Sequence, residues 1–427
     1  MRVLYLIHAH EQFSVGGAEN AAFSLFRAMQ DQPDTECWIL AAMHTSQGVL
    51  AHGELRNVEG SDREYLIGTS CEWFRFQNVA IGEMKRSLQR LLDHIKPDII
   101  HLQHYSHFGI DVIPLLQTIS PKSKIVVTLH EYLALCMHNG QMVTTGKLKL
   151  CHKATPLACS LCFPEHTPQE MFLRSHYIRT ILESCDALVS PSQFLIDRYR
   201  ACGIDHPNFV MIENGLPASF DESKREGYSA SYSAELNRFG YFGQLNRYKG
   251  VLVLLQAVAL LQEQGVRNFI VNINGANLEH QQQDFQDEFY TLHQAVKDRV
   301  ILRGSYRQQD IEALMLENDW LVMPSIWWEN SPVVIQEALF YRRPVLASNI
   351  GGTAEKVTGL GGNTFAVSNP TSLATLLASS VGNQLAHKEL LDAIPPPSSH
   401  TTCSSSHNAI YSKILANKEA TKDMALL

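Results

Sequence analysis

The sequence predicts an α/β protein built from two Rossmann-like domains in tandem. Short apolar runs alternate with amphipathic segments along the chain, which is the pattern of parallel strands covered by helices. The alternation occurs as two series, separated by a segment from Pro217 to Leu236 that is rich in Ser, Glu and Ala. We therefore expect an N-terminal domain over residues 1–215, a second domain over 216–395 and a tail over 396–427.

The apolar runs of the two series give the individual strands. Buried parallel strands are short, rich in Val, Ile, Leu and aromatic residues, and bounded by turn residues. The helix after the first strand has one apolar face at helical spacing, formed by Ala18, Ala21, Ala22, Leu25, Phe26 and Met29. The expected strands are Val3–Ile7, Cys37–Ala41, Ile99–Leu102, Ile125–Leu129, Ala187–Ser190 and Phe209–Ile212, then Gly240–Phe242, Phe269–Ile273, Val300–Leu302, Trp320–Met323 and Pro344–Ala347.

Two carboxylates, Glu329 and Glu337, flank an expected helix start. The segment Asp319–Ser325 indicates a buried strand ending in a turn, Ser331 suits an N-cap, and Pro332 suits the first helical position. Glu337 then lies in the second turn, roughly 7 Å along the axis. Free amides at such a start, including those of Ser331, Val333 and Val334, form an anion site. An anion site between two carboxylates suits a sugar nucleotide, although an incidental acidic pair on a surface helix is the alternative.

Polar residues also follow the strands of the first series. Ligands of open parallel sheets bind at the carboxyl ends of strands. Gly16-Gly17 would let backbone amides approach a phosphate or an acceptor, or would form a simple tight turn. The other groups at these strand ends are His8 and His10, His101 and His104, and His130-Glu131-Tyr132.

The stretch from Pro324 to Gly352 resembles the signature of the group 1 (family 4) retaining glycosyltransferases. It has a Pro-Ser strand end, two Glu residues eight positions apart, Glu337-Ala338-Leu339, a Pro344–Ser348 strand and Gly351-Gly352. The resemblance implies the GT-B fold, with two Rossmann-like domains facing each other across a cleft. By resemblance, Glu329 faces the donor sugar and Glu337 holds the ribose.

The resemblance extends over most of the chain. Gly16-Gly17-Ala18-Glu19 is similar to the family's first loop, and His130-Glu131-Tyr132 to its His-Asp-aromatic motif, whose His contacts the donor sugar. Glu131 replaces the usual Asp. In the tail, Pro395-Pro396-Pro397 and a Ser/Thr-rich run to Ser406 are typical of disorder, but apolar residues from Ala409 to Leu415 recur at helical spacing. The family's last helix crosses back to the first domain, so we expect a helix there.

Lys249 is the candidate cation of the second domain. A lysine at a helix start is ordinarily a solvated charge, but near the Glu329 loop it would neutralise a departing nucleoside diphosphate. The family has Arg where this chain has Gln244, so Arg247 is the candidate substitute. Because the helix terminus and these two cations supply the positive field, we expect no metal at the diphosphate and no other cofactor.

Composition excludes several other classes. The net charge of −8 gives no support for nucleic-acid binding, and it leaves open a local basic patch for peripheral membrane contact. Nine cysteines without a recognisable secretory signal favour a reduced, cytoplasmic chain. Four of them, Cys136, Cys151, Cys159 and Cys162, form a loose cluster in which only the last pair has zinc-ligand spacing. Both a structural metal site and a set of free thiols are consistent with this cluster.

The sequence thus predicts a retaining, hexosyltransferase-like enzyme of the kind that serves polysaccharide biosynthesis. By resemblance its partners are a nucleotide-sugar donor and a glycan, lipid-linked or small-molecule acceptor. The resemblance also implies a front-face mechanism, in which the leaving phosphate itself takes the acceptor's proton. The alternatives are a nucleotide-sugar epimerase of the same fold and a non-catalytic sugar-binding protein.

Overall fold

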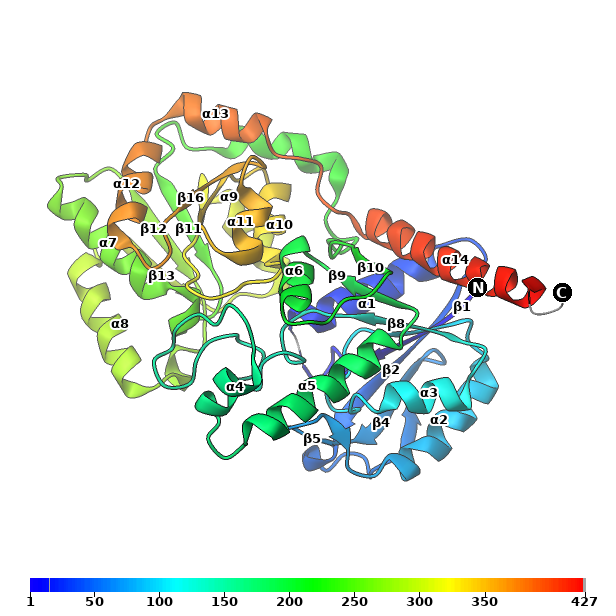
Figure 1. Cartoon of the computed structure of the whole chain (residues 1–427). Coiled ribbons are helices and arrows are strands. Elements are labelled where there is room, and N and C mark those ends of the chain that lie inside the picture. The colour runs from blue at the N-terminus through cyan, green and yellow to red at the C-terminus, as the bar shows by residue number, and fades with distance from the viewer. Residues whose placement is uncertain (15, 425–427) are drawn as a thin grey trace. The chain divides into compact units, whose positions relative to one another are not determined.

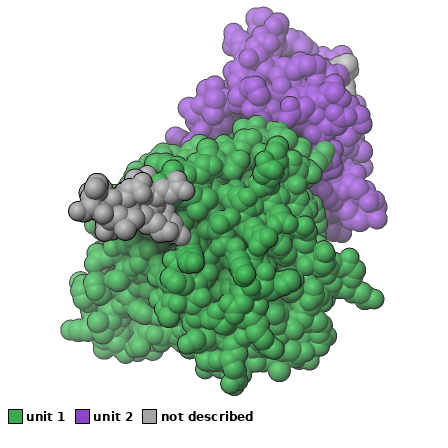
Figure 2. Space-filling view, turned by 90° about the vertical axis from the view of Figure 1, so that its right-hand side faces the viewer, with its two compact units in different colours: residues 1–218, 398–427 green, residues 219–397 purple. Residues whose placement is uncertain are grey.

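The computed structural model describes residues 1–14 and 16–424 and has a mixed α/β architecture. The chain divides into two compact units, one formed by residues 1–218 with 398–427 and the other by residues 219–397 (Figure 2). Each unit is built on its own largely parallel sheet with helices around it (Figure 1). The predicted fold class is therefore confirmed.

The sheet of unit 1 has the strand order β10-β9-β8-β7-β1-β2-β4-β3, and all its neighbours pair in parallel except β3 with β4. Its central strands are buried, apart from Arg2 at the start of β1, because helices cover both faces, as the continuous apolar runs require. The strands are β1 (Arg2–Ile7), β2 (Glu36–His44), β3 (Leu55–Asn57), β4 (Glu64–Thr69), β7 (Ile99–Leu102), β8 (Lys124–Thr128), β9 (Ala187–Ser190) and β10 (Phe209–Met211), with a separate hairpin of β5 (Cys71–Glu72) and β6 (Gln77–Asn78).

The helices of unit 1 include the tail. Residues from His400 to Met424 form α14, which packs against α1 and gives Cys403, Ile410, Tyr411 and Ile414 to the core around Tyr5. The other helices are α1 (Gly17–Gln30), α2 (Ile81–Ile95), α3 (Val112–Ile119), α4 (Pro156–Cys162), α5 (Pro168–Glu183) and α6 (Gln193–Ala201), with the short turn η1 (Thr45–Gln47).

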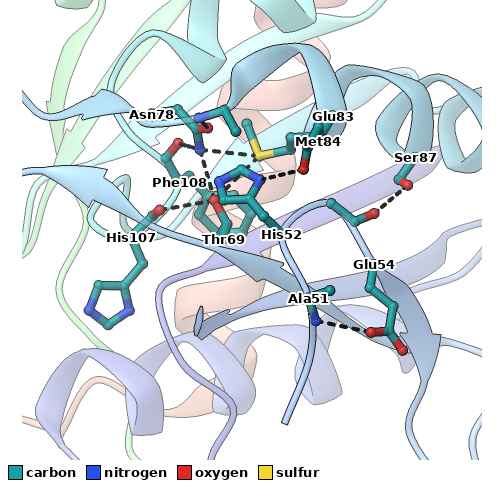
Figure 3. A network of polar contacts seen from close by, with 12 residues as sticks. Ala51, His52, Glu54, Thr69, Asn78, Glu83, Met84, Ser87, His107 and Phe108 are labelled. Carbon is teal, nitrogen blue, oxygen red and sulfur yellow. Dashed lines mark hydrogen bonds and ion pairs between the residues drawn. The ribbon is translucent and has the colours of Figure 1, made fainter. Parts of the chain in front are cut away.

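A buried polar network fixes the end of β4 (Figure 3). Asn78 donates to Thr69 Oγ1 at 2.8 Å and to the Phe108 carbonyl at 2.7 Å, and Thr69 donates to the His107 carbonyl at 3.2 Å. Because the buried side chains of Asn78 and Thr69 both have partners, they hold these loops rigidly. It thereby positions His107, whose ring Nδ1 bonds the His8 carbonyl at 2.8 Å beyond the end of β1.

The sheet of unit 2 is wholly parallel, in the order β13-β12-β11-β14-β15-β16. Its strands are β11 (Arg238–Phe242), β12 (Ile270–Asn274), β13 (Val300–Gly304), β14 (Trp320–Met323), β15 (Val345–Ser348) and β16 (Gly362–Phe365). Its helices are α7 (Val251–Glu263), α8 (Gln283–Val296), α9 (Ile311–Leu316), α10 (Val333–Phe340), α11 (Gly351–Val357), α12 (Pro370–Ser380) and α13 (Gln384–Asp392), with turns η2 (Glu222–Ser231), η3 (Arg247–Lys249), η4 (Leu278–His280) and η5 (Gln308–Asp310).

The start of α10 differs from the sequence prediction. Helix α10 begins at Val333, its N-cap residue is Pro332 in an extended conformation, and no side chain caps it. Ser331 is therefore not the N-cap, and Pro332 is not the first helical residue. The chain stays extended because the Glu329 carbonyl accepts a hydrogen bond from the Gly352 amide at 2.9 Å, which ties this loop to the start of α11. A Cβ at Gly352 would meet the Asn330 carbonyl oxygen at 1.5 Å, so the close approach requires glycine.

Candidate active site

Lys249 and Glu329 form an ion pair in unit 2, with Lys249 Nζ 2.6 Å from Glu329 Oε1. Lys249 ends the turn η3, which Asn246 caps by accepting from the amides of Tyr248 and Lys249, each at 3.0 Å. Gly250 follows at φ +71°, and a Cβ there would meet the Pro324 carbonyl oxygen at 1.8 Å. This contact brings the loop after β11 against the loop after β14, and so places the lysine beside the glutamate.

Glu329 is a buried carboxylate that stays ionised. Burial alone would raise its pKa, but the charge of Lys249 and three hydrogen bonds outweigh burial and lower it. All three donors converge on Oε1, because Ser325 Oγ and Trp327 Nε1 each lie 2.8 Å from the atom that Lys249 contacts. Oε2 therefore keeps its acceptor capacity for a hydroxyl-bearing ligand.

Glu337 has the opposite electrostatic character. Its side chain is buried on α10, and burial raises its pKa, while a hydrogen bond from Gln308 Nε2 to Oε1 at 3.2 Å only partly offsets that effect. The two pKa values are shifted in opposite directions. Glu329 therefore accepts hydrogen bonds as a carboxylate, whereas Glu337 holds a proton more readily. The two predicted glutamates are thus chemically distinct, with Glu329 in the loop before α10 and Glu337 on α10 itself.

The mouth of α10 contains a buried polar atom with no protein partner. Ser331 Oγ forms no hydrogen bond with any described residue, and the same is true of Ser348 Oγ at the end of β15 and Thr353 Oγ1 in α11. Buried hydroxyls ordinarily find partners, so such atoms point to a ligand or water. Val333 and Val334 form the first turn of α10, whose amides lack intrahelical acceptors.

Arg247 lies apart from Glu329. Its guanidinium Nη2 bonds Asp284 Oδ2 at 3.1 Å near the start of α8 and stacks over the Phe285 ring. Gln244, which stands at the family's Arg position, accepts from Asn246 through Oε1 at 3.2 Å. Of the two predicted cations, only Lys249 is joined to Glu329.

In unit 1, His130 follows β8 at the carboxyl edge of the sheet. Its Nε2 lies 3.2 Å from Gln103 Oε1, so Nε2 carries the proton. Burial lowers the pKa of His130 to about 4, with a smaller contribution from His8, so the ring is neutral at pH 7. His101 on β7 is structural, because its ring bonds Tyr411 OH at 2.6 Å and Thr128 Oγ1 at 2.7 Å.

Gly16 and Gly17 stand at the start of α1 next to a buried carboxylate. Burial disfavours the ionised form of Glu19, but His8, 3.3 Å away, and Ser14 outweigh burial and lower the pKa of Glu19 to about 2. A Cβ at Gly16 would meet Glu19 Oε2 at 2.6 Å. A negative charge already occupies this helix start, which favours a hydroxyl-bearing ligand over a phosphate here.

The raised pKa of Glu131 is a site feature that the sequence did not reveal. Burial raises its pKa to about 8, Oε2 accepts from the Leu133 amide, and His104 Nε2 lies 3.5 Å from Oε1. The residue type gave no indication of this proton, since it depends on how deeply the loop buries the side chain. Ser325, Trp327 and Gln308, which anchor the two unit 2 glutamates, were missed for the same reason.

None of the nine cysteines of the chain, the four clustered ones included, forms a disulfide. Burial raises the pKa of Cys136 and Cys151, and that of Cys159 to about 11. Within residues 1–14 and 16–424, no group of three or more His, Cys, Asp or Glu side chains is arranged to hold a metal ion. Over the same residues no helix combines the length and apolar character that crossing a bilayer requires.

Comparison with known proteins decides the family. Residues 15–220 match the model of Glycosyltransferase Family 4, and residues 237–383 match that of Glycosyl transferases group 1. The chain belongs to the group 1 (family 4) glycosyltransferases. Its fold is that of GT-B glycosyltransferases.

Solved and curated glycosyltransferases resemble the chain to different extents. Sucrose-phosphate synthase of Thermosynechococcus elongatus is similar with a TM-score of 0.67 and 14% identity, covering 98% of this chain and 100% of that one. HepE of Anabaena, solved in complex with UDP, has a TM-score of 0.60 and 16% identity, with all of both chains covered. A probable glycogen synthase of Methanocaldococcus jannaschii is 25% identical over 154 residues, which span 36% of this chain but only 28% of that relative.

Proposed function

We propose that this glycosyltransferase transfers a sugar from a nucleotide-sugar donor to a glycan, lipid-linked or small-molecule acceptor, with retention of anomeric configuration. The observation that carries the proposal is the Lys249–Glu329 pair beside the mouth of α10. It combines an ionised carboxylate for sugar hydroxyls with a cation and free helix amides for a diphosphate. Binding of UDP by HepE, which has the same fold, supports a nucleotide donor.

We assign the donor to unit 2. Glu337 would hold the ribose hydroxyls, since a carboxyl group offers them both a donor and an acceptor when it is protonated. Ser331 Oγ and the amides of Val333 and Val334 would bind the phosphates, which gives the buried hydroxyl a partner. Glu329 would bind the sugar through Oε2, because Oε1 is already saturated with donors.

The proposed reaction breaks the bond between the sugar's anomeric carbon and the diphosphate oxygen, and forms a bond to the acceptor oxygen on the same face. The acceptor's proton passes to the leaving phosphate. Lys249 stabilises the negative charge that grows on that phosphate. His130, neutral at pH 7, would act as a hydrogen-bonding contact to the donor sugar rather than as an acid. Unit 1 would bind the acceptor through Gly16-Gly17 and the strand-end groups around His8.

A thermal-shift screen against a panel of nucleotide sugars tests the donor assignment, because a ligand that binds only the folded state raises its melting temperature. The expected result is a shift with a subset of nucleotide sugars and with the matching free nucleoside diphosphate. Incubation with that donor and candidate acceptors should then release nucleoside diphosphate and give a product with the donor's anomeric configuration by NMR. An inverted product would contradict retention. Conversion of the donor to another nucleotide sugar, without release, would identify an epimerase instead.

A further inference from the structure

Unit 1 exposes an unusual set of large apolar side chains on α4 and α5, which lie side by side (Figure 1). On α4, Leu157 is 65% exposed and Leu161, one helical turn later, is 78% exposed. On α5, Phe172 is 56% exposed and Leu173 57% exposed. Scattered exposed apolar residues are normal, but four of them on one pair of packed helices indicate a binding surface.

A hairpin next to α4 adds a fifth apolar side chain and two lysines. Val143 and Leu150 form an antiparallel bridge, and at the tip Leu148 is 43% exposed between the exposed Lys147 and Lys149. Thr145 Oγ1 donates to the carbonyl of Cys162, the last residue of α4, at 2.9 Å. This bond attaches the hairpin to the helix pair, so the five apolar residues belong to one structural region.

The exposed residues do not result from loosely packed helices. Thr155 caps α4, and Thr167 with Glu170 forms a capping box at the start of α5. The opposite face of α5 is anchored by the buried Arg174, whose guanidinium bonds the carbonyls of Phe74, Leu133 and Ala134. The helices are therefore held from within, and Phe172 and Leu173 contribute nothing to that anchoring.

The charges around this surface are mainly basic, although the whole chain carries a net charge of −8. Lys147, Lys149 and Lys153 are exposed, and within the described part of the chain none of them forms an ion pair. Arg179 of α5 lies on the same side of its helix as Phe172, since His176, which stacks on Phe172, also contacts Arg179. Two acids lie nearby: Glu170 is engaged by the capping box, and Glu165, in the link between α4 and α5, is exposed, so the three lysines remain in excess.

We infer that the α4–α5 surface, defined as Leu148, Leu157, Leu161, Phe172 and Leu173 with the lysines 147, 149 and 153, docks unit 1 onto an anionic lipid bilayer. Apolar side chains beside lysines are the composition of interfacial anchors, because the apolar groups enter the acyl boundary while the lysines meet anionic headgroups. A second copy of the chain fits less well. A two-fold interface through this surface would bring the same lysines of both copies close together.

The position of the surface links it to the acceptor. The surface lies on unit 1, the unit to which the proposed function assigns the acceptor, in the segment between β8 and β9. The choice of acceptor rests on that proposed function: of the three acceptor classes, a surface that docks on a bilayer favours the lipid-linked one. The docking itself does not depend on transferase activity, so a binding assay without nucleotide or acceptor tests it separately.

The test is sedimentation of the purified chain with vesicles of phosphatidylcholine alone and of phosphatidylcholine with about 30% phosphatidylglycerol, a composition that gives an anionic surface. The chain should sediment with the anionic vesicles about tenfold more strongly than with the neutral ones. The double substitution Leu157→Ser with Leu161→Ser should weaken binding about tenfold or more. Leu385→Ser is the matched control, because Leu385 on α13 of unit 2 is also 78% exposed, and it should leave binding unchanged.

A second double substitution, Lys147→Ser with Lys149→Ser, separates charge from apolar burial. Each lysine removed should cost about fivefold in binding to anionic vesicles and have no effect with neutral ones. Equal melting temperatures of variants and wild type establish that folding is intact. The inference is overturned if the wild type ignores anionic vesicles, or if the leucine variant binds as the wild type does. It is also overturned if analytical ultracentrifugation shows that the wild type is a dimer and the leucine variant is a monomer.

Discussion

Lys249 and Glu329 lie 80 positions apart in the chain and meet at 2.6 Å through a single carboxylate oxygen. The lysine both fixes the orientation of the glutamate and keeps it ionised against the effect of burial. One cation thus serves two purposes at this site, since it is also the charge nearest to where we place the diphosphate. Any change at Lys249 must therefore act on Glu329 as well.

Lys249→Ala should reduce kcat/KM about a hundredfold or more, which corresponds to the roughly 2–4 kcal/mol that a charge-assisted contact contributes in a water-poor site. Arg247→Ala should have a much smaller effect, because Arg247 pairs with the exposed Asp284 and such surface pairs contribute about 0–1 kcal/mol. Steady-state kinetics of the two single variants separate the cases. A larger loss for Arg247→Ala would move the phosphate contact to that residue.

The pH profile of Lys249→Ala provides a second readout. Without the lysine, burial acts on Glu329 with less opposition, so the pKa of its carboxyl rises. The residual activity should then fall at acidic pH values where the wild type is still active, because protonated Glu329 loses acceptor capacity. An unchanged acidic limb would mean that Lys249 does not control the ionisation of Glu329.

Residue type and periodicity were sufficient for most of the fold. All six strands expected in the first series overlap observed strands, namely β1, β2, β7, β8, β9 and β10. The sequence missed β4, whose Glu64–Thr69 segment mixes polar and apolar residues, and β16, whose Gly362–Phe365 segment has a single large apolar side chain. Both lie toward the edges of their sheets, where the demand for apolar residues on both faces is weaker.

The candidate site was harder to predict from the sequence, because its details depend on contacts between loops that are distant in the chain. Motif spacing identified Lys249 and Glu329, but not that they bond each other. The start of α10 was misplaced because the tie between Glu329 and Gly352 overrides the local preferences of Ser331 and Pro332. Similarly, the pairing of Arg247 with Asp284 depends on where α8 begins in space, which no local pattern specifies.

Glu337→Ala should weaken the binding of both the nucleotide sugar and the free nucleoside diphosphate, about tenfold or more, because both share the ribose that Glu337 would hold. Glu329→Ala serves as the comparison and should mainly lower turnover or the discrimination between donor sugars. Titration calorimetry with nucleoside diphosphate distinguishes them. If nucleotide affinity is the same in Glu337→Ala and wild type, the ribose assignment is wrong.

Transferase activity should survive incubation with excess EDTA. Lys249 and the amides at the start of α10 would supply the positive field at the diphosphate, so turnover requires no divalent cation. The measurement is the initial rate before and after chelation, with magnesium or manganese added back. Recovery of a lost rate on adding either ion would refute charge neutralisation by the protein. Slow unfolding in EDTA would instead indicate a metal at the cysteine cluster.

The last prediction concerns the pH dependence of stability. Burial raises the pKa of Glu131 from 4.5 to about 8 in the folded chain. The folded state therefore holds a proton that the unfolded state has released once the pH exceeds 4.5, and stability falls as the pH rises from there to about 8. Above that value the folded carboxyl is ionised too, and this contribution is lost.

Glu131→Gln should remove this pH dependence, because the neutral amide preserves an acceptor for the Leu133 amide and has no proton to lose. The variant should melt close to the wild type at acidic pH and above it on the alkaline side of about 8, the folded-state pKa of Glu131. Thermal melts of both chains across this range provide the measurement.

Glu165→Gln is the control, since Glu165 is exposed and its replacement should leave the pH dependence unchanged. A constant difference in melting temperature between Glu131→Gln and wild type at every pH would show that Glu131 is not protonated in the folded chain. Its replacement of the family's Asp would then have to be explained by the length of its side chain alone.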